Sequence, residues 1–127
     1  PFCGDVEIVC IRRNRDLVRF CETVNKWKKV KGLPTGRYTQ RILPGGETLD
    51  LFMADVNNWG LIYAIRTGSA AYSHKVLARG WTMKGYTSRD GVLVRTNDPL
   101  VATYIREEQE LFDLIEIPFC KPELREA

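Results

Sequence analysis

The chain begins with alternating apolar and polar residues, the pattern of a β-strand that has one covered face. In the stretch 4–11, Val6 and Ile8 point to one side of the strand. Asp5 and Glu7 point to the other side, with their backbone positions roughly 7 Å apart. The pattern therefore predicts a first strand with an apolar face and an acidic face.

Four further stretches complete the predicted first half of the chain. Apolar residues at helical spacing predict a helix over 16–24, with Asp16 as its N-cap. Stretch 27–32 predicts a short exposed strand, and stretches 35–43 and 47–53 predict a hairpin joined by a Pro-Gly-Gly turn. We therefore predict a small mixed or antiparallel sheet with an acidic face and a helix packed behind it.

The second half combines helical patterns with a short ribbon. The expected elements are helices over 59–66, 70–83 and 107–115 and a two-stranded ribbon formed by 84–87 and 91–94. Ser69 is the expected N-cap of the middle helix, and residues 96–99 are expected to form a loop. Residues from Pro122 onward are expected to form a polar tail. Together the two halves predict an α+β fold.

Composition limits the function without naming it. Of the 127 residues, 44% are hydrophobic and 28% are charged, as in an ordinary globular domain. No apolar run approaches the ~18 residues that a membrane helix needs. The four cysteines lack C-x-x-C spacing and there is one histidine, which argues against a zinc site and favours reduced thiols in a cytosolic protein. The net charge of +3 permits a polyanionic partner without requiring one.

Asp50 is the most informative acid because it stands between Leu49 and Leu51 in an apolar strand pattern. A carboxylate buried there without a partner would cost several kcal/mol, so one interpretation is a bound cation or a chemical role. If the two strands are neighbours, Asp5, Glu7 and Asp50 converge as an all-oxygen site of the kind that holds Mg²⁺. The alternative interpretation is a solvated strand face, because D-x-E is a common chance pattern.

Four segments of the sequence form a characteristic series: Gly4-Asp5-Val6-Glu7, Leu49-Asp50-Leu51-Phe52, Arg66-Thr67-Gly68-Ser69 and residues 108–126. In this order they resemble the C-terminal half of a family X (polymerase β-like) DNA polymerase. Gly4-Asp5-Val6-Glu7 resembles the strand with that family's first two metal ligands, and Leu49-Asp50-Leu51-Phe52 resembles the strand with the third. Arg66-Thr67-Gly68-Ser69 is similar to the turn from the palm lobe into the thumb lobe. Segment 108–126, which starts Glu-x-Glu-Leu-Phe and ends Pro-Phe-x-x-Pro-Glu-x-Arg-Glu, is similar to the closing signature of the thumb. The resemblance covers nearly the whole chain.

The resemblance implies a nucleotidyltransferase with a palm lobe over 1–56 and a thumb-like lobe over 57–127. It implies Mg²⁺ (or Mn²⁺) as cofactor, and a DNA primer/template and a deoxynucleoside triphosphate as partners. In the implied two-metal reaction, the nucleotide passes to a primer 3′-hydroxyl. The implied site residues are catalytic and metal-binding Asp5, Glu7 and Asp50; nucleotide-binding Arg66, Thr67, Gly68 and Ser73; and DNA-binding His74, Lys75 and Arg79.

One part of the family pattern lies before the first strand. The Gly-Ser motif, helix and arginine that hold the triphosphate in the family precede that strand, and the sequence starts too late to contain them. We therefore expect weak triphosphate binding, and three functions stay open. The first is a cytoplasmic templated nucleotidyltransferase, a small viral or bacterial polymerase-like protein or a piece of one. The second is a catalytically impaired nucleic-acid-binding fragment of such a polymerase. The third is a small non-polymerase nucleotidyltransferase, against which the thumb-like half argues.

Overall fold

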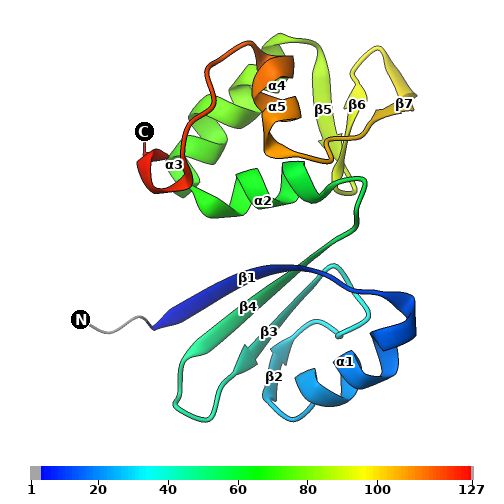
Figure 1. The fold of residues 1–127 in the computed structure, drawn as a ribbon, viewed down its shortest axis with the longest axis vertical. Helices are drawn as coiled ribbons and strands as arrows, with labels where there is room; N and C mark the ends of the chain where they lie inside the picture. Colours follow the sequence, from blue (N-terminus) through cyan, green and yellow to red (C-terminus); the bar gives the residue numbers. More distant parts are fainter. Residues whose placement is uncertain (1–3, 127) are drawn as a thin grey trace. The chain divides into compact units, whose positions relative to one another are not determined.

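The computed structural model describes residues 4–126 (Figure 1). The chain forms two compact units, of which unit 1 ends at Asp55 and unit 2 begins at Val56. Each unit has its own sheet and its own cluster of buried apolar residues. Each unit therefore buries apolar surface of its own.

Unit 1 is built on a four-stranded mixed sheet. The strands lie in the order β1 (Asp5–Ile11), β4 (Thr48–Ala54), β3 (Tyr38–Ile42) and β2 (Lys28–Lys31). β1 runs parallel to β4, whereas the β4–β3 and β3–β2 pairs are antiparallel. The Pro-Gly-Gly turn joins β3 to β4, as the pattern predicts. The mixed sheet confirms the expected fold class in this half.

The two faces of this sheet differ in what covers them. A 3₁₀ turn, η1 (Asn14–Asp16), leads into α1 (Leu17–Val24), which packs on one face (Figure 1). The buried core between α1 and the sheet consists of Val24 of α1 and Leu49, Leu51 and Met53 of β4. Asp16 is the N-cap residue of α1, as predicted, although its side chain makes no capping hydrogen bond. The other face of the sheet carries the acidic residues of β1 and β4.

Unit 2 packs helices against a three-stranded antiparallel sheet. Its helical elements are α2 (Trp59–Thr67), α3 (Ala70–Tyr72), η2 (Ser73–Ala78), α4 (Arg79–Met83), α5 (Glu108–Ile115) and the 3₁₀ turn η3 (Pro122–Leu124). Its strands, in spatial order, are β5 (Tyr86–Arg89), β6 (Val92–Arg95) and β7 (Asp98–Thr103). Helices and strands are thus mixed within each unit, and the α+β prediction is confirmed.

β7 is the strand that the sequence pattern does not reveal. The predicted ribbon has two strands, and residues 96–99 are expected to form a loop, yet β7 begins at Asp98. Its residues are exposed as far as Ala102, so it has no covered face and no alternation of apolar and polar positions. Because β7 is an edge strand, it also tolerates Pro99, whose missing N–H would interrupt a central strand.

The helix expected over 70–83 is present, but its winding changes in the middle. Ser69 caps it as predicted, because its Oγ accepts a hydrogen bond from the Tyr72 N–H at 3.0 Å. The segment η2 is π-helical. Tyr72 and Leu77 are both buried and stand five residues apart. A regular α-helix would place them about 140° apart around its axis, whereas i→i+5 winding brings them to one face.

Unit 2 has the larger core of the two. Among residues 4–126, the buried members of its cluster are Leu61, Ala64, Tyr72, Leu77, Trp81, Leu93, Ile105, Leu111, Phe112 and Ile115. Gly60 lets α2 approach the start of α5 closely, since a Cβ at this position would lie 2.3 Å from the carbonyl carbon of Glu107. The fold of unit 2 therefore depends on close packing between α2 and α5.

Candidate functional site

The strand register brings two of the predicted acids side by side. In the parallel pair β1–β4, Glu7 lies opposite Asp50, and Asp5 lies opposite Thr48. Residues opposite each other share a face of the sheet and sit about 4.8 Å apart between strands. Asp5 projects from that same face, two residues further along β1. All three carboxylates therefore belong to the face that α1 does not cover.

Asp50 is half-buried, and neutral donors satisfy one of its two oxygens. The Tyr38 hydroxyl and the Gln40 side-chain amide both donate to Asp50 Oδ1, the latter at 2.9 Å. Tyr38 and Gln40 come from β3, the other neighbour of β4. Asp50 Oδ2 accepts no hydrogen bond from the residues that the structure describes. This geometry fixes the orientation of the carboxylate and leaves Oδ2 available.

The three acids have the donor chemistry of a hard-cation site, but they do not form a closed cluster. Within residues 4–126, no group of three or more His, Cys, Asp or Glu side chains is gathered closely enough to hold a metal ion. The register places Glu7 opposite Asp50, whereas Asp5 lies two residues away from Glu7 along β1. Carboxylate oxygens on one open face nevertheless fit Mg²⁺ or Mn²⁺, which take a few carboxylates together with water and substrate phosphate.

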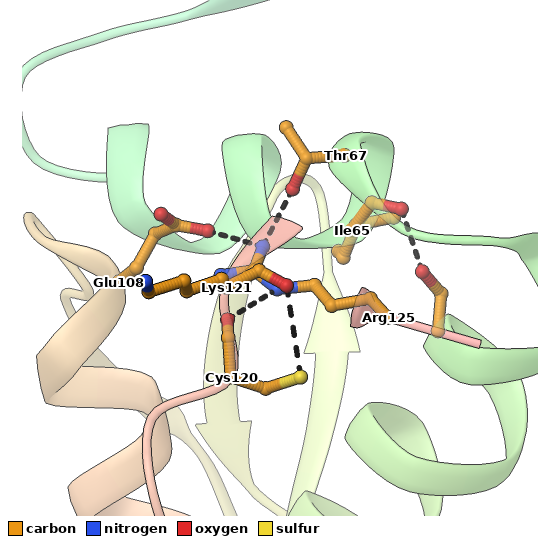
Figure 2. Close-up of polar contacts among 7 residues, drawn as sticks. Ile65, Thr67, Glu108, Cys120, Lys121 and Arg125 are labelled. Atoms are coloured by element: carbon orange, nitrogen blue, oxygen red, sulfur yellow. Dashed lines mark hydrogen bonds and ion pairs between the residues drawn. The ribbon is translucent and has the colours of Figure 1, made fainter. Parts of the chain in front are cut away.

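In unit 2, the turn after α2 is held by a buried arginine from the end of the chain (Figure 2). The Arg125 guanidinium donates from Nη1 to Thr67 Oγ1 at 2.6 Å. The Ser69 N–H donates to the Arg125 carbonyl oxygen at 2.9 Å. Gly68 lies between these contacts, and a Cβ on it would come 2.7 Å from Arg125 Cβ. The Thr67-Gly68-Ser69 turn is thus fixed in place by Arg125 at three successive residues.

Arg125 itself is 1% exposed, and its Nε and Nη1 atoms both donate hydrogen bonds. Its Nη1 lies 2.5 Å from Glu108 Oε2 at the start of α5, and its Nε donates to the Cys120 carbonyl oxygen at 2.8 Å (Figure 2). The guanidinium carbon lies 5.2 Å and 5.5 Å from the ring centroids of Phe112 and Phe119. The expected polar tail is therefore wrong at this residue. A closing Arg in a run of polar residues carries no periodicity that would reveal its burial.

The other predicted nucleotide-binding residues lie near that turn. Ser73 is half-buried and donates to the Ile65 carbonyl oxygen of α2 at 2.6 Å, so its hydroxyl proton is already engaged. The Ser73 hydroxyl oxygen can therefore only accept a hydrogen bond from a ligand. Arg66 is exposed in the last turn of α2. The structure thus gathers Arg66, Thr67 and Gly68 at the C-terminal end of one helix, with Ser73 packed against it.

The predicted DNA-binding residues meet in one surface hollow. His74 and Lys75 are exposed on η2, and Arg79 is exposed at the start of α4. These three side chains, with Ala78, Thr82 and Met83, line a hollow of about 440 Å³. A basic hollow along one helix is chemically suited to phosphate groups.

Two further groups have a pKa that burial shifts. Burial raises the pKa of the Cys10 thiol, and the nearby Arg12 opposes that rise. Burial also raises the pKa of the Tyr72 hydroxyl, with a smaller contribution from its hydrogen bond to Cys120. Cys10 lies on the α1 side of the sheet and Tyr72 lies in the core of unit 2. Neither group contacts the acidic face.

Comparison with known proteins supports the fold. No protein-family model matches the sequence, and no curated protein matches it. A solved structure of polymerase β from Leishmania infantum, described as a ternary P/T complex, matches 100% of this chain with a TM-score of 0.68 at 18% sequence identity. The chain has a polymerase β-like fold. It spans 63% of the length of that polymerase chain, so the likeness concerns one part of a larger protein.

The polymerase β-like fold agrees with the family resemblance seen in the motifs, and at this identity the likeness establishes the fold alone. The roles of the ten site residues stay predictions. Sequence patterns also missed Tyr38 and Gln40, which orient Asp50; their alternation along β3 was the available signal. In the described part of the chain, no helix is both long and apolar enough to cross a membrane.

Proposed function

We propose that this chain is the nucleotidyltransferase part of a polymerase β-like DNA polymerase, which transfers a nucleotide from a deoxynucleoside triphosphate to a primer 3′-hydroxyl, with pyrophosphate as the leaving group. The observation that carries the proposal is the register that sets Glu7 beside Asp50 on neighbouring strands, with Asp5 on the same face. The polymerase β-like fold supports it, since the acids lie on the strands where the motif resemblance puts them.

The acidic face supplies the reaction centre of this proposal. Asp5, Glu7 and Asp50 would hold Mg²⁺ or Mn²⁺, which when bound lowers the pKa of an attacking hydroxyl and offsets phosphate charge. Tyr38 and Gln40 hold Asp50 through Oδ1, so Oδ2 is the oxygen that would accept the primer hydroxyl proton. The carboxylate is thereby oriented before substrate binds, which removes an ordering cost from the reaction.

Unit 2 supplies binding surfaces. Thr67 and Gly68 would line the nucleotide from a turn that Arg125 makes rigid, with Arg66 and Ser73 beside it. The hollow lined by His74, Lys75 and Arg79 would contact the phosphate backbone of DNA, where cations give affinity that does not depend on sequence.

The test is primer extension by the full chain with a labelled primer–template, Mg²⁺ and a saturating deoxynucleoside triphosphate. Asp50→Asn keeps the shape and hydrogen bonds of the side chain but removes its charge. We expect it to lower the extension rate about 10²- to 10³-fold, the range for loss of one preorganised electrostatic contact. Glu22→Gln, an exposed acid on α1, is the matched control and should leave the rate unchanged.

The outcomes separate the proposal from the alternative functions. Extension whose rate Asp50→Asn lowers by this amount and Glu22→Gln leaves intact supports a templated polymerase. DNA binding without any extension by the wild-type chain would instead support a nucleic-acid-binding fragment that lacks catalysis. Nucleotide transfer to a non-nucleic-acid acceptor would support a small nucleotidyltransferase of another class.

A further inference from the structure

The β2–β3 hairpin of unit 1 is strongly basic. Between Glu22 and Glu47 the sequence has six Lys and Arg residues and no Asp or Glu, whereas the whole chain has a net charge of only +3. Three of these cations, Lys28, Lys29 and Lys31, belong to the edge strand β2, and all three are exposed. None of them forms an ion pair with a residue in the range 4–126.

The register connects two of these lysines with the acidic face. One row across the sheet runs through Glu7, Asp50, Gln40 and Lys31, and a second runs through Asp5, Thr48, Ile42 and Lys28. Residues paired in register share a face. The open face of unit 1 therefore has carboxylates along its β1 edge and ammonium groups along its β2 edge.

An irregularity in β2 puts both lysines on that face. The pairing with β3 shifts between Lys29 and Lys31, so that Val30 is the extra residue. Without the shift, Lys28 and Lys31 would point to opposite faces, since they are three residues apart. Lys29 pairs with Arg41, a residue buried on the α1 side, so Lys29 points away from the acidic face.

Side-chain contacts link Lys31 with Asp50. The Lys31 Nζ lies 5.6 Å from the centroid of the Tyr38 ring, whose hydroxyl donates to Asp50. With strands about 4.8 Å apart, the Cα of Lys31 stands about 10 Å from that of Asp50, two strand spacings away. Phosphates of one DNA strand follow each other at about 3.4 Å along the helix axis, so a duplex whose axis runs along this direction would place about three phosphates within the span.

We propose that Lys28 and Lys31 bind the phosphate backbone of the strand being extended, over the first few phosphates behind its 3′ end. This rests on the proposed function, which places the 3′-hydroxyl at Asp50. A strand that starts at the acidic edge and crosses the open face meets Lys31 and Lys28 in turn, and each cation replaces condensed counterions. The β2 edge thereby determines the direction in which the primer leaves the reaction centre.

The test measures binding of a fluorescein-labelled primer–template DNA by fluorescence anisotropy at several salt concentrations, without triphosphate. Lys31→Ala and Lys28→Ala should each lower the slope of log affinity against log salt concentration by about 0.9, the value for one lost phosphate contact. Lys29→Ala is the matched control, because it removes the same charge from the same strand on the other face. It should change the slope much less.

A second measurement locates the contact. Methylphosphonates, which are uncharged, replace single primer phosphates near the 3′ end or far from it. Neutralising a phosphate within about the last three should remove most of the effect of Lys31→Ala, since the lysine has then lost its partner. Neutralising a distant phosphate should leave that effect intact.

The results separate this inference from the proposed function. If all three lysine variants change the slope equally, or none does, the cations act only as diffuse charge and the inference is overturned, whatever the extension assay shows. If the effect of Lys31→Ala is insensitive to phosphates near the 3′ end, the assigned position is overturned. The third outcome is that only the Lys28 and Lys31 variants lower the salt slope while Asp50→Asn extends the primer at the normal rate. The backbone contact then stands and the catalytic proposal fails.

Discussion

In the part of the chain that the structure describes, each unit buries one arginine, and the surroundings of the two charges differ. In unit 2, Arg125 is 1% exposed and its charge is met by Glu108 at 2.5 Å, with two aromatic rings against the guanidinium. In unit 1, Arg41 is 2% exposed, and within residues 4–126 it donates only to Thr39 Oγ1 and the Trp27 carbonyl oxygen. No carboxylate in residues 4–126 pairs with Arg41.

The difference shows that burial alone does not reveal what a charged side chain does. The charge of Arg125 is compensated by Glu108, and the residue stabilises unit 2 by joining three segments: the end of α2, the start of α5 and the closing segment. The charge of Arg41 is uncompensated and adds to the positive potential of the β2–β3 hairpin. Both arginines have a buried Nη2 without a hydrogen-bond partner, so neither guanidinium group has all of its donors paired.

The largest expected effect is the loss of the Arg125 contacts. Arg125→Met should lower the free energy of unfolding of unit 2 by about 3–5 kcal/mol, because it leaves Glu108 without its counter-charge in a largely buried position. Urea unfolding followed by amide hydrogen exchange in α2 and α5 measures the change. The double variant Arg125→Met with Glu108→Leu is the control, and it should recover part of the loss. Equal instability of the single and double variants would contradict this account.

A smaller effect is expected when the carboxylate alone is neutralised. Glu108→Gln keeps a hydrogen-bond acceptor for Arg125 but removes the negative charge, so the loss should be about 1.5–3 kcal/mol. The same urea titration measures it. Gln109→Glu on the neighbouring exposed position serves as a control for charge on α5 and should change stability by less than about 0.5 kcal/mol.

A still smaller effect is expected for the arginine of unit 1. Arg41→Met removes two hydrogen bonds to neutral acceptors and leaves no carboxylate without its counter-charge. The free energy of unfolding of unit 1 should therefore fall by only about 1 kcal/mol. Amide exchange in β3 and β4 measures the loss. A cost for Arg41→Met as large as that for Arg125→Met would show that the comparison of the two charges is wrong.

The smallest expected effect is a different response of the two units to alkaline pH. The pKa of Cys10 is raised above 9.0 and that of Tyr72 above 10.0 in the folded chain, in both cases chiefly by burial. Each group therefore holds its proton in the folded state after the unfolded chain has lost it, so the stability it contributes is present at lower pH and is lost as pH rises. Unit 1 should begin to weaken near pH 9, and unit 2 only near pH 10.

Stability curves against pH for the wild type, Cys10→Ala and Tyr72→Phe measure this difference. Cys10→Ala should remove the earlier loss in unit 1 without changing unit 2, and Tyr72→Phe should do the reverse. A common alkaline onset in both units that neither substitution moves would contradict it.

The sequence predicted best those parts in which one face of an element is covered. Alternation along β1 and β4 located Asp5, Glu7 and Asp50, and the turn residues located the β3–β4 hairpin. β7 was missed because an exposed edge strand shows no alternation. The burial of Arg125 could not be predicted because its partners Thr67 and Glu108 are 58 and 17 residues away along the chain.

The parallel pairing of β1 with β4 also affects the order in which unit 1 folds. β3 and β4 form a hairpin and can meet early, whereas β1 pairs with a strand 43 residues further along the chain. The chain closes that long loop at an entropic cost before the pairing stabilises it. As an edge strand, β1 also has β4 as its one strand neighbour in the described sheet. We therefore expect the pairing that sets Glu7 beside Asp50 to be the last part of unit 1 to assemble and the first to separate, while the β3–β4 hairpin stays folded.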